Sequence, residues 1–469
     1  MEDICERFPL IGKNILNILD DKHLSNCKEV CKPLYHFLDT ERFFVLRVIK
    51  SYQIPIGEFT PSWKKVLKKM PFKLLQELSE FLVKQDKIGF AVFPPLHIAA
   101  QSGSLSLCEY VIQKIENMNE KCFLGHNALF YAVSGGCLQI CKLLVENEID
   151  VCNKDKNRKT ALHHAAKKGS IEIFKLINQN ITNYDGMFQE GYNPMHIAAI
   201  YGNADVINFL LENAADKNPR DGNGETVLHI AARYGQIEIC KLIMPHLKKK
   251  NPGSNNGKTP LHLAAINGYA DVASWICLKH VEDKNPRMNN GITPIHQAAR
   301  NSHLDSVKTC IANLVHGNIK NYTGFTPLHE AVTSGNFEVV KFLIDNVKNK
   351  NPASNNGTTP LHLAVFYIRY KVSLPRDLSN KTFLEYLNMC KLIIANVTDK
   401  NPADHYGITP LHIAANEGYL EVFKLIFDNS SNKNPVTKGG ETPEMIAKEK
   451  GHLEIVAMYS KVSIIRPVR

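Results

Sequence analysis

The sequence predicts an all-α solenoid in which short helical hairpins stack one after another. A four-residue motif of the type Thr-Pro-Leu-His recurs throughout residues 94–445. Its last position falls at 97, 130, 163, 196, 229, 262, 296, 329, 362, 412 and 445. Every step is 33 residues except one of 34 and one of 50, and glycine follows six residues later in nine of the eleven units. Self-similarity at such a period is typical of stacked-repeat architectures.

Each unit carries signals for two helices. Thr-Pro suits a helix start, because Thr is a good N-cap and Pro at the first helical position has no N–H to satisfy. The glycine favours the left-handed conformation that ends a first helix. An apolar stretch such as 239–243 then has the spacing of a second helix. A single unit cannot bury its apolar face alone, so we expect stacking to form the core.

At these motifs the chain resembles the ankyrin-repeat family, whose hallmark is Thr-Pro-Leu-His-x-Ala-Ala followed by Gly. The resemblance covers about residues 88–460 and implies eleven repeats, followed by a basic tail at 461–469. The first and last units depart from the pattern, and we expect them to cap the array. Repeat nine carries an insertion at about 368–384 between its two helices. This insertion either has a functional role or only lengthens the helix pair.

Composition is typical of a water-soluble protein, and the net charge favours binding to acidic partners. Its 469 residues carry a formal net charge of +10, which favours acidic partners without requiring nucleic acid. The 12 cysteines form no regular framework, and neither a signal-peptide pattern nor a membrane-spanning apolar run is present. We therefore expect an intracellular protein with reduced thiols. Binding of single-stranded nucleic acid is the least favoured class, because no stacking-platform motif is found.

Several motifs that suggest chemistry have a simpler structural interpretation. The recurring histidines lie one per repeat, and the family resemblance implies that they tie neighbouring loops together and bind no metal. The segment 253–259 imitates a phosphate-binding loop, but only three residues separate its glycines. Cys141, Cys240 and Cys390 share the context Cys-Lys-Leu, which predicts core packing. The sequence therefore predicts a protein that is not an enzyme and uses no cofactor.

Residues 1–87 do not follow the repeat. Segment 1–40 resembles an F-box and 41–87 is expected to be a helical linker. Two departures from the F-box pattern occur: Gly12-Lys13 replaces its acidic position, and Leu34-Tyr35 replaces its Trp. The resemblance implies that the segment binds a Skp-family adaptor; an ordinary N-terminal helical cap of the solenoid is the alternative. The implied adaptor-binding residues are Phe8, Pro9, Leu10, Ile15, Leu16, Ile18, Leu19, Leu24, Cys27, Val30, Cys31 and Leu34.

The family resemblance also implies a partner-binding surface on the finger turns and first helices. Its variable positions here are rich in aromatic and basic residues, which are enriched at binding hot spots. They are Lys159, Lys167, Lys168, Tyr192, Tyr201, Arg233, Tyr234, Arg300, Tyr322, Phe325, Phe366, Tyr367 and Tyr406. A recurring Lys-Asn-Pro adds Lys217, Lys250, Lys284, Lys350 and Lys400. These lysines either form a ladder for an acidic partner or cover apolar surface with their stems.

Together these features predict a protein–protein interaction module. With both resemblances, the expected function is substrate recognition in an SCF-type cullin–RING ubiquitin ligase, in which the F-box recruits the Skp-family adaptor and the array holds a substrate protein. The alternative is an ankyrin scaffold or inhibitor with no link to ubiquitin ligases.

Overall fold

The computed structural model describes residues 94–122, 124–181, 191–279, 283–313, 317–372 and 376–464. The predictions for segments 1–40 and 41–87 lie outside these residues. The chain divides into two compact units, Met1–Ala214 and Ala215–Arg469. Throughout the described ranges the regular structure is helical, and the single β-bridge joins Arg220 and Thr226. No helix in these ranges is long and apolar enough to cross a membrane.

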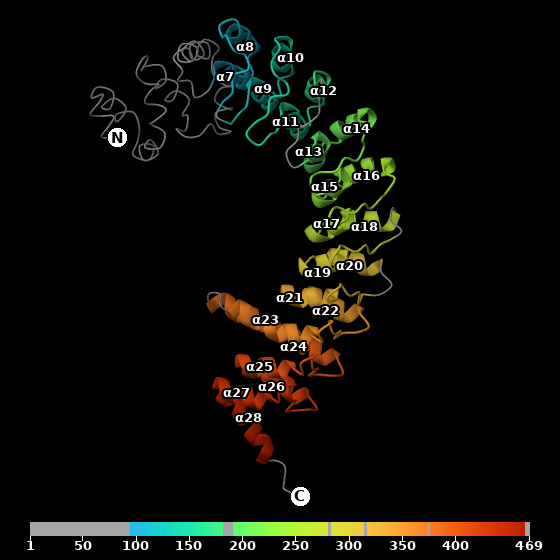
Figure 1. Ribbon diagram of the computed structural model, residues 1–469, viewed down its shortest axis with the longest axis vertical. Coiled ribbons are helices and arrows are strands. Elements are labelled where there is room, and N and C mark those ends of the chain that lie inside the picture. The colour runs from blue at the N-terminus through green and yellow to red at the C-terminus, as the bar shows by residue number, and fades with distance from the viewer. Residues whose placement is uncertain are drawn as a thin grey trace, which may run out of the picture. The chain divides into compact units, whose positions relative to one another are not determined.

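The described part of the first unit contains four helical hairpins. Its first helices pack against one another in sequence order, and each second helix packs against its own first helix (Figure 1). The helices are α7 (Pro95–Ser102), α8 (Leu105–Ile112), α9 (Ala128–Gly135), α10 (Leu138–Glu146), α11 (Ala161–Lys168), α12 (Ile171–Gln179), α13 (Pro194–Tyr201) and α14 (Ala204–Asn213).

The second unit repeats this arrangement seven times. Its helices are α15 (Val227–Arg233), α16 (Ile237–Ile243) with the 3-10 turn η2 (Met244–His246), α17 (Pro260–Asn267), α18 (Ala270–Lys279), α19 (Pro294–Arg300), α20 (Leu304–Ala312), α21 (Pro327–Ser334), α22 (Phe337–Asn346), α23 (Pro360–Val372), α24 (Arg376–Asn396), α25 (Pro410–Glu417), α26 (Leu420–Asn429), α27 (Pro443–Lys450) and α28 (Leu453–Ile464). The family-based expectation of helical hairpins is confirmed for these ranges.

The hallmark residues start and stop each first helix as the sequence predicts. In α17, Thr259 is the N-cap, Pro260 occupies the first turn, and Thr259 and His262 form a reciprocal capping box. The helix ends at Gly268, whose φ of 79° is strained for any residue with a β-carbon. Repeat seven lacks this glycine, and there Ser302 adopts a φ of 65° instead. In repeat nine, which also lacks the glycine, Ile368 instead lies within the helix Pro360–Val372, so the left-handed conformation is kept in repeat seven but not in repeat nine.

Small side chains let the first helices approach closely, and second helices supply the larger core residues. Ala264 and Ala265 of α17 have no exposed surface. Cys141, Cys240 and Cys390 are fully buried in the second helices, which confirms their predicted packing role. The equivalent position is filled elsewhere by larger apolar side chains such as Phe174, which is also fully buried.

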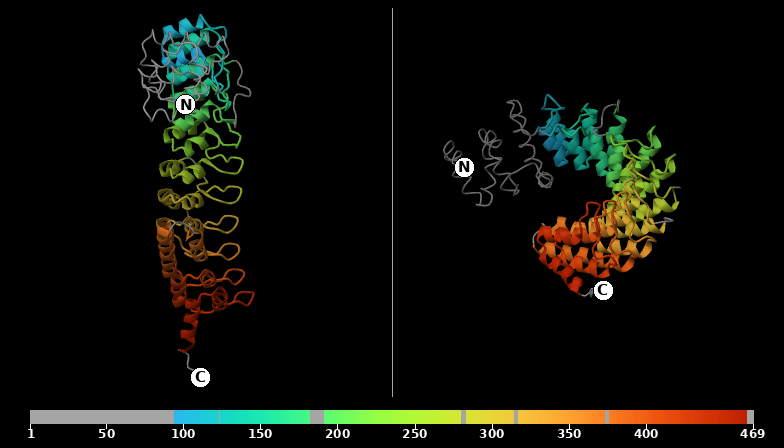
Figure 2. Two further views of the ribbon diagram at one scale, coloured as in Figure 1. Left: turned by 90° about the vertical axis from the view of Figure 1, so that its left-hand side faces the viewer. Right: turned by 60° about the horizontal axis from the view of Figure 1, so that its bottom comes forward.

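Finger turns stack through backbone hydrogen bonds. In the second unit the amide of Asn255 donates to the carbonyl of Asn223 at 3.0 Å, and that of Asn289 donates to Asn256 at 3.2 Å. The amide of Tyr322 donates to Asn290 at 3.2 Å. Figure 2 shows these turns projecting side by side from one edge of the helices. The tips of the fingers thus form an ordered row of side chains.

The insertion in repeat nine lengthens both of its helices. Helix α23 has 13 residues and α24 has 21, whereas α21 has 8 and α22 has 10. Within α24, Tyr386 has no exposed surface, and its hydroxyl lies 3.4 Å from the carbonyl oxygen of Thr333. The insertion therefore lengthens the helix pair, and a functional role for it stays a prediction.

Candidate functional site

Large aromatic side chains are exposed along the finger turns and first helices of the second unit. Tyr322 and Tyr406, on finger turns, are 62% and 66% exposed. Tyr234, which follows α15, is 45% exposed, and Phe366 of α23 is 38% exposed. All four are among the predicted partner-binding residues. The four rings occupy different positions of the repeat pattern, and their exposed surface can contact another molecule.

Other predicted aromatic residues are partly covered by neighbours. The ring of Phe325 stacks on His329 with 4.8 Å between centroids. Tyr367 meets Phe366 edge-on at 5.6 Å. In the first unit, Tyr192 is half-buried and packs edge-on against His196 at 5.6 Å. These rings have less surface available for a partner than the four exposed ones.

The first unit carries a separate basic and aromatic group. Lys159, Lys167 and Lys168 are exposed, and Tyr201 is 47% exposed at the end of α13. The amino group of Lys167 lies over the ring of Tyr201, 5.1 Å from its centroid. This cation–π contact couples two of the predicted residues at the surface.

The two predicted arginines differ in how far they are already engaged. Arg233 contacts both carboxylate oxygens of Glu225, at 2.5 and 2.6 Å. Glu225 is buried; burial raises its pKa, and the Arg233 charge acts in the opposite direction. Arg300 is 58% exposed and its Nε lies 3.8 Å from Oε2 of buried Glu330. Arg300 is therefore the arginine with more surface open to a partner.

The Lys-Asn-Pro lysines have a role that sequence reasoning missed. Lys250 donates to the carbonyl of Met244 at 2.6 Å, just after α16. Lys400 donates to the carbonyls of Ile394 and Val397 at the end of α24, and Lys433 does so at the end of α26. Lys350 reaches Oδ1 of Asn396 at 3.1 Å. The amino groups of Lys250, Lys400 and Lys433 therefore satisfy carbonyls at helix C-termini, which lack intrahelical donors, whereas that of Lys350 bonds a side chain.

The remaining two lysines of the proposed ladder differ from these. Lys217 is half-buried and Lys284 is exposed. The signal for a capping role was the position of the lysine a few residues after each second helix, where basic side chains bond the last carbonyls.

The recurring histidines are structural. In the second unit their Nε2 atoms lie close to carbonyl oxygens of the following repeat: His229 to Lys258 at 2.9 Å, His262 to Ile292 at 3.1 Å. Burial lowers the pKa of both rings to about 4, so they are neutral at pH 7. The prediction that these rings tie neighbouring loops together is confirmed.

Family comparison agrees with this geometry. A family model described as ankyrin repeats, in three copies, matches residues 73–155, 96–186, 150–221, 216–288, 276–353 and 381–459. The chain belongs to the ankyrin-repeat family. No curated protein matches it. Ankyrin repeats are protein–protein interaction modules, and the stretch between the last two matches, 354–380, includes most of the repeat-nine insertion.

Some exposed residues of the ankyrin array were not predicted as binding residues. Ile408 is 37% exposed and Val436 is 58% exposed, both on finger turns of the second unit. Leu124 of the first unit is 40% exposed in a finger turn. The sequence signal was an apolar residue within an otherwise polar turn, a position from which its side chain does not pack into the core.

Sequence reasoning also missed a cluster of metal-ligand type. Among the described residues, His126, Asp155 and His164 bring one ligand atom each to within 4.8 Å of one another. His126 belongs to repeat two, and Asp155 and His164 belong to repeat three. The three become neighbours only when these repeats stack, so no local sequence motif indicates the cluster.

Proposed function

We propose that the ankyrin array binds a partner protein through an aromatic surface on its second unit. We define the aromatic surface as Tyr234, Tyr322, Phe366 and Tyr406, with Arg300 among them. The observation that carries the proposal is the exposure of these rings, which range from 38% to 66%.

Tyrosine suits this role for physical reasons. Its ring buries a large apolar area, its hydroxyl keeps a hydrogen-bonding group at the surface, and it has few rotatable bonds to immobilise. Aromatic residues and arginine also dominate the hot spots of protein interfaces. Rings that are spaced along several repeats would each contribute to one extended interface.

The proposed partner carries acidic groups next to apolar ones. Arg300 and Lys284 are exposed in the same unit, and the whole chain has a net charge of +10. Complementary charge raises the association rate and selects between partners more than it adds affinity.

The test is cross-linking in cells that express the full chain, followed by identification of the cross-linked peptides by mass spectrometry. One variant replaces Tyr234, Tyr322, Phe366 and Tyr406 with Ala. A matched control variant replaces four exposed residues of the second helices, Glu238, Asp305, Lys341 and Lys424, with Ala. The proposal expects partners that cross-link to the finger turns, lost in the aromatic variant and kept in the control. Equal loss in both variants, or no loss in either, overturns it.

A narrower proposal concerns the N-terminal segment. We propose that residues 8–38 recruit a Skp-family adaptor, so that the array presents its partner to a ubiquitin ligase. The support is the F-box resemblance from Phe8-Pro9 to Val30-Cys31 in the sequence. The family matches begin at residue 73, so this proposal rests on the residue pattern alone.

Co-purification of the full chain with the adaptor tests this proposal separately. We expect a complex that the double variant Leu16→Asp, Leu24→Asp loses and the four-fold aromatic variant keeps. If the intact chain forms no such complex, the adaptor proposal is wrong. The alternative function, an ankyrin scaffold or inhibitor that binds its partner through the aromatic surface, then remains.

A further inference from the structure

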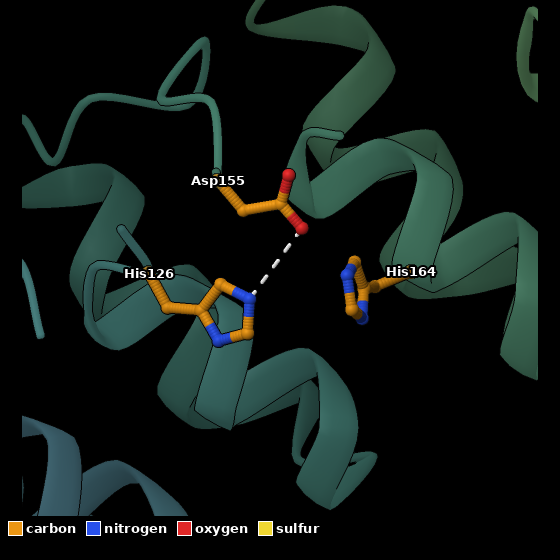
Figure 3. Close-up of side chains that lie close together, drawn as sticks. All are labelled: His126, Asp155 and His164. Atoms are coloured by element: carbon orange, nitrogen blue, oxygen red, sulfur yellow. Dashed lines mark ion pairs between the residues drawn. The ribbon is translucent and has the colours of Figure 1, made fainter. Parts of the chain in front are cut away.

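Three side chains of metal-ligand type meet in the first unit. His126 immediately precedes Asn127, the N-cap of α9; Asp155 lies in the finger turn before α11; and His164 is in the first half of α11. Nε2 of His126 lies 3.6 Å from Oδ2 of Asp155. Figure 3 shows the carboxylate between the two imidazole rings. We propose that His126, Asp155 and His164 form a binding site for a zinc-like divalent metal ion.

The backbone holds the two finger turns in this arrangement. The amide of Lys156, next to Asp155, donates to the carbonyl of Leu124 at 3.0 Å. The side chain of Asn153 donates to the carbonyl of Gly125 at 2.9 Å, and His97 Nε2 lies 2.8 Å from the carbonyl oxygen of His126. The residues that flank the proposed ligands are therefore fixed from both sides. Because the finger turns are already held in place, metal binding requires little rearrangement of the backbone.

Packing does not account for the identity of His164. The equivalent position, directly after the hallmark residue, holds an aliphatic side chain in most other repeats, as in Ile197, Ile230, Leu263, Leu363 and Ile413. The position of His126 is histidine in no other repeat. Among the described residues, two imidazoles meet the carboxylate of a finger turn only between repeats two and three.

The two carboxylate oxygens of Asp155 have different partners. Its Oδ1 accepts from the amide of Lys159 at 2.7 Å, as finger-turn carboxylates do elsewhere in the array. In repeat ten, for example, Oδ1 of Asp404 accepts from the amide of Ile408 at 2.8 Å. The other oxygen of Asp155 faces His126. A metal ion at Oδ2 would leave the turn intact.

One aromatic side chain orients both imidazoles. The ring of His126 stacks on Phe130 at 4.5 Å, and His164 packs edge-on against the same ring at 5.1 Å. Phe130 therefore fixes the orientation of both ligand rings before any metal binds.

The donor set fits zinc. Two imidazoles and one carboxylate with an open fourth position are typical of zinc sites that keep a water or accept an outside ligand. Tetrahedral bonds of about 2.1 Å place ligand atoms roughly 3.4 Å apart. The His126–Asp155 pair at 3.6 Å already meets this spacing, and the whole group, within 4.8 Å, closes by small side-chain rotations. Bound metal would link repeats two and three.

The test uses the full chain, made without a polyhistidine tag and stripped of metal with a chelator. Zn²⁺ binding is measured by calorimetry, and Co²⁺ is added as a spectroscopic probe of coordination geometry. The variants are His126→Gln, Asp155→Asn and His164→Ile, the last chosen because other repeats hold Ile there. His405→Gln, at an exposed finger-turn histidine, is the control.

We expect one Zn²⁺ per chain, binding at least about tenfold more weakly in each of the three variants and unchanged in the control. The Co²⁺ complex should have the intense visible bands of tetrahedral nitrogen and oxygen coordination, without thiolate charge-transfer bands. Zn²⁺ should also raise the melting temperature of the wild-type chain and not that of His164→Ile. Equal affinity in wild type and folded variants, weak binding at many sites only, or thiolate bands would each overturn the proposal. The site is independent of the aromatic surface.

Discussion

Nε2 of His262 lies 3.1 Å from the carbonyl oxygen of Ile292, which belongs to the finger turn of the next repeat. The Nδ1 atom of the same ring lies 3.0 Å from Oγ1 of Thr259. One buried side chain therefore caps its own helix and also bonds the following repeat. This double contact explains why a polar residue recurs at a core position, since each of its nitrogens has a partner.

Replacing this histidine should weaken the second unit. His262→Ala removes the ring from Thr259 and leaves the carbonyl of Ile292 without its buried donor. We expect the free energy of unfolding to fall by about 2–3 kcal/mol. Urea unfolding followed by circular dichroism measures this loss. The control His246→Ala changes an exposed histidine of η2 and should cost less than about 0.5 kcal/mol. Similar losses in both variants would contradict the bridging role.

The bridging histidines should make stability depend on pH. Burial lowers the pKa of His229, His262, His296 and His329 to about 4, from a usual value of 6.5. Between pH 6.5 and 4 the unfolded chain therefore binds protons that the folded chain does not. Stability is fully present above pH 6.5 and is lost as pH falls towards 4, by up to about 1.4 kcal/mol per pH unit for each histidine.

Buried carboxyl groups act in the opposite direction. Burial raises the pKa of Glu225 and Glu330, so the folded chain takes up their protons first as pH falls, which favours folding. Burial also lowers the pKa of His362 and His412. In the described part of the second unit, two such glutamates therefore stand against six histidines, and we expect the histidines to dominate. Urea midpoints at pH 7.5, 6.5, 5.5 and 4.5 test this, with a shallower dependence for His262→Ala. A constant midpoint from pH 7.5 to 5 would refute the prediction.

The sequence predicted the fold well because the repeat is local and periodic. Thr259, Pro260 and Gly268 act within one helix, so their roles follow from residue type and spacing. The inter-repeat bond of His262 followed from the family resemblance. By contrast, Tyr322 and Phe325 were both predicted as binding residues, but their rings differ in exposure. His329 stacks on the ring of Phe325, and this contact is visible only in the structure.

Contacts across repeats were the least predictable. His126, Asp155 and His164 come from different elements, and their distances depend on how two repeats stack. The sequence shows that Lys400 follows α24 by a few residues. It does not show the path of the turn that brings the amino group of Lys400 back to the end of that helix. A single sequence gives neither the path of a turn nor the relation of one turn to the next.

The backbone at Ser302 is strained in a way that one substitution should relieve. Its φ of 65° lies in the left-handed region, where nine of the eleven repeats have glycine. Its hydroxyl makes only a long contact of 3.5 Å with that of Ser334. Ser302→Gly should therefore raise the free energy of unfolding by up to about 1 kcal/mol.

Gly268→Ala is the reciprocal control. Thermal and urea unfolding measure the stability of both variants. Gly268 has a φ of 79°, and a β-carbon there would lie 2.6 Å from Nδ1 of His303. We expect this change to destabilise by more than 1 kcal/mol, roughly the cost of left-handed strain alone. A loss of stability in Ser302→Gly would show that the hydroxyl contact outweighs the strain.

Buried cysteines should resist modification in the folded chain. Cys240 has no exposed surface, and burial raises the pKa of its thiol to about 12. Cys137 and Cys152 are half-buried. A thiol reagent at pH 7.5 should label these two before Cys240, because thiolate character and access control the rate. Peptide mapping by mass spectrometry measures the order, and denatured chain gives the reference. Early labelling of Cys240 would mean that the second unit opens readily.

Two lysines of the Lys-Asn-Pro series separate a capping role from a partner-binding role. Lys400 bonds carbonyls at the end of α24, whereas Lys284 is exposed. Lys400→Gln should lower the free energy of unfolding by about 1 kcal/mol, because it removes a charged donor from a helix C-terminus. Lys284→Gln should leave stability within about 0.5 kcal/mol of wild type.

Binding distinguishes the two roles further. If the lysines form a ladder for an acidic partner, both variants should bind a polyglutamate peptide more weakly than wild type, with the difference vanishing at high salt. If Lys400 only caps its helix, Lys284→Gln alone affects binding, since the amino group of Lys400 already points at the backbone. Fluorescence anisotropy at two salt concentrations measures this. Unchanged binding in both variants would remove the lysine series from the partner-binding surface and leave the aromatic residues to carry it.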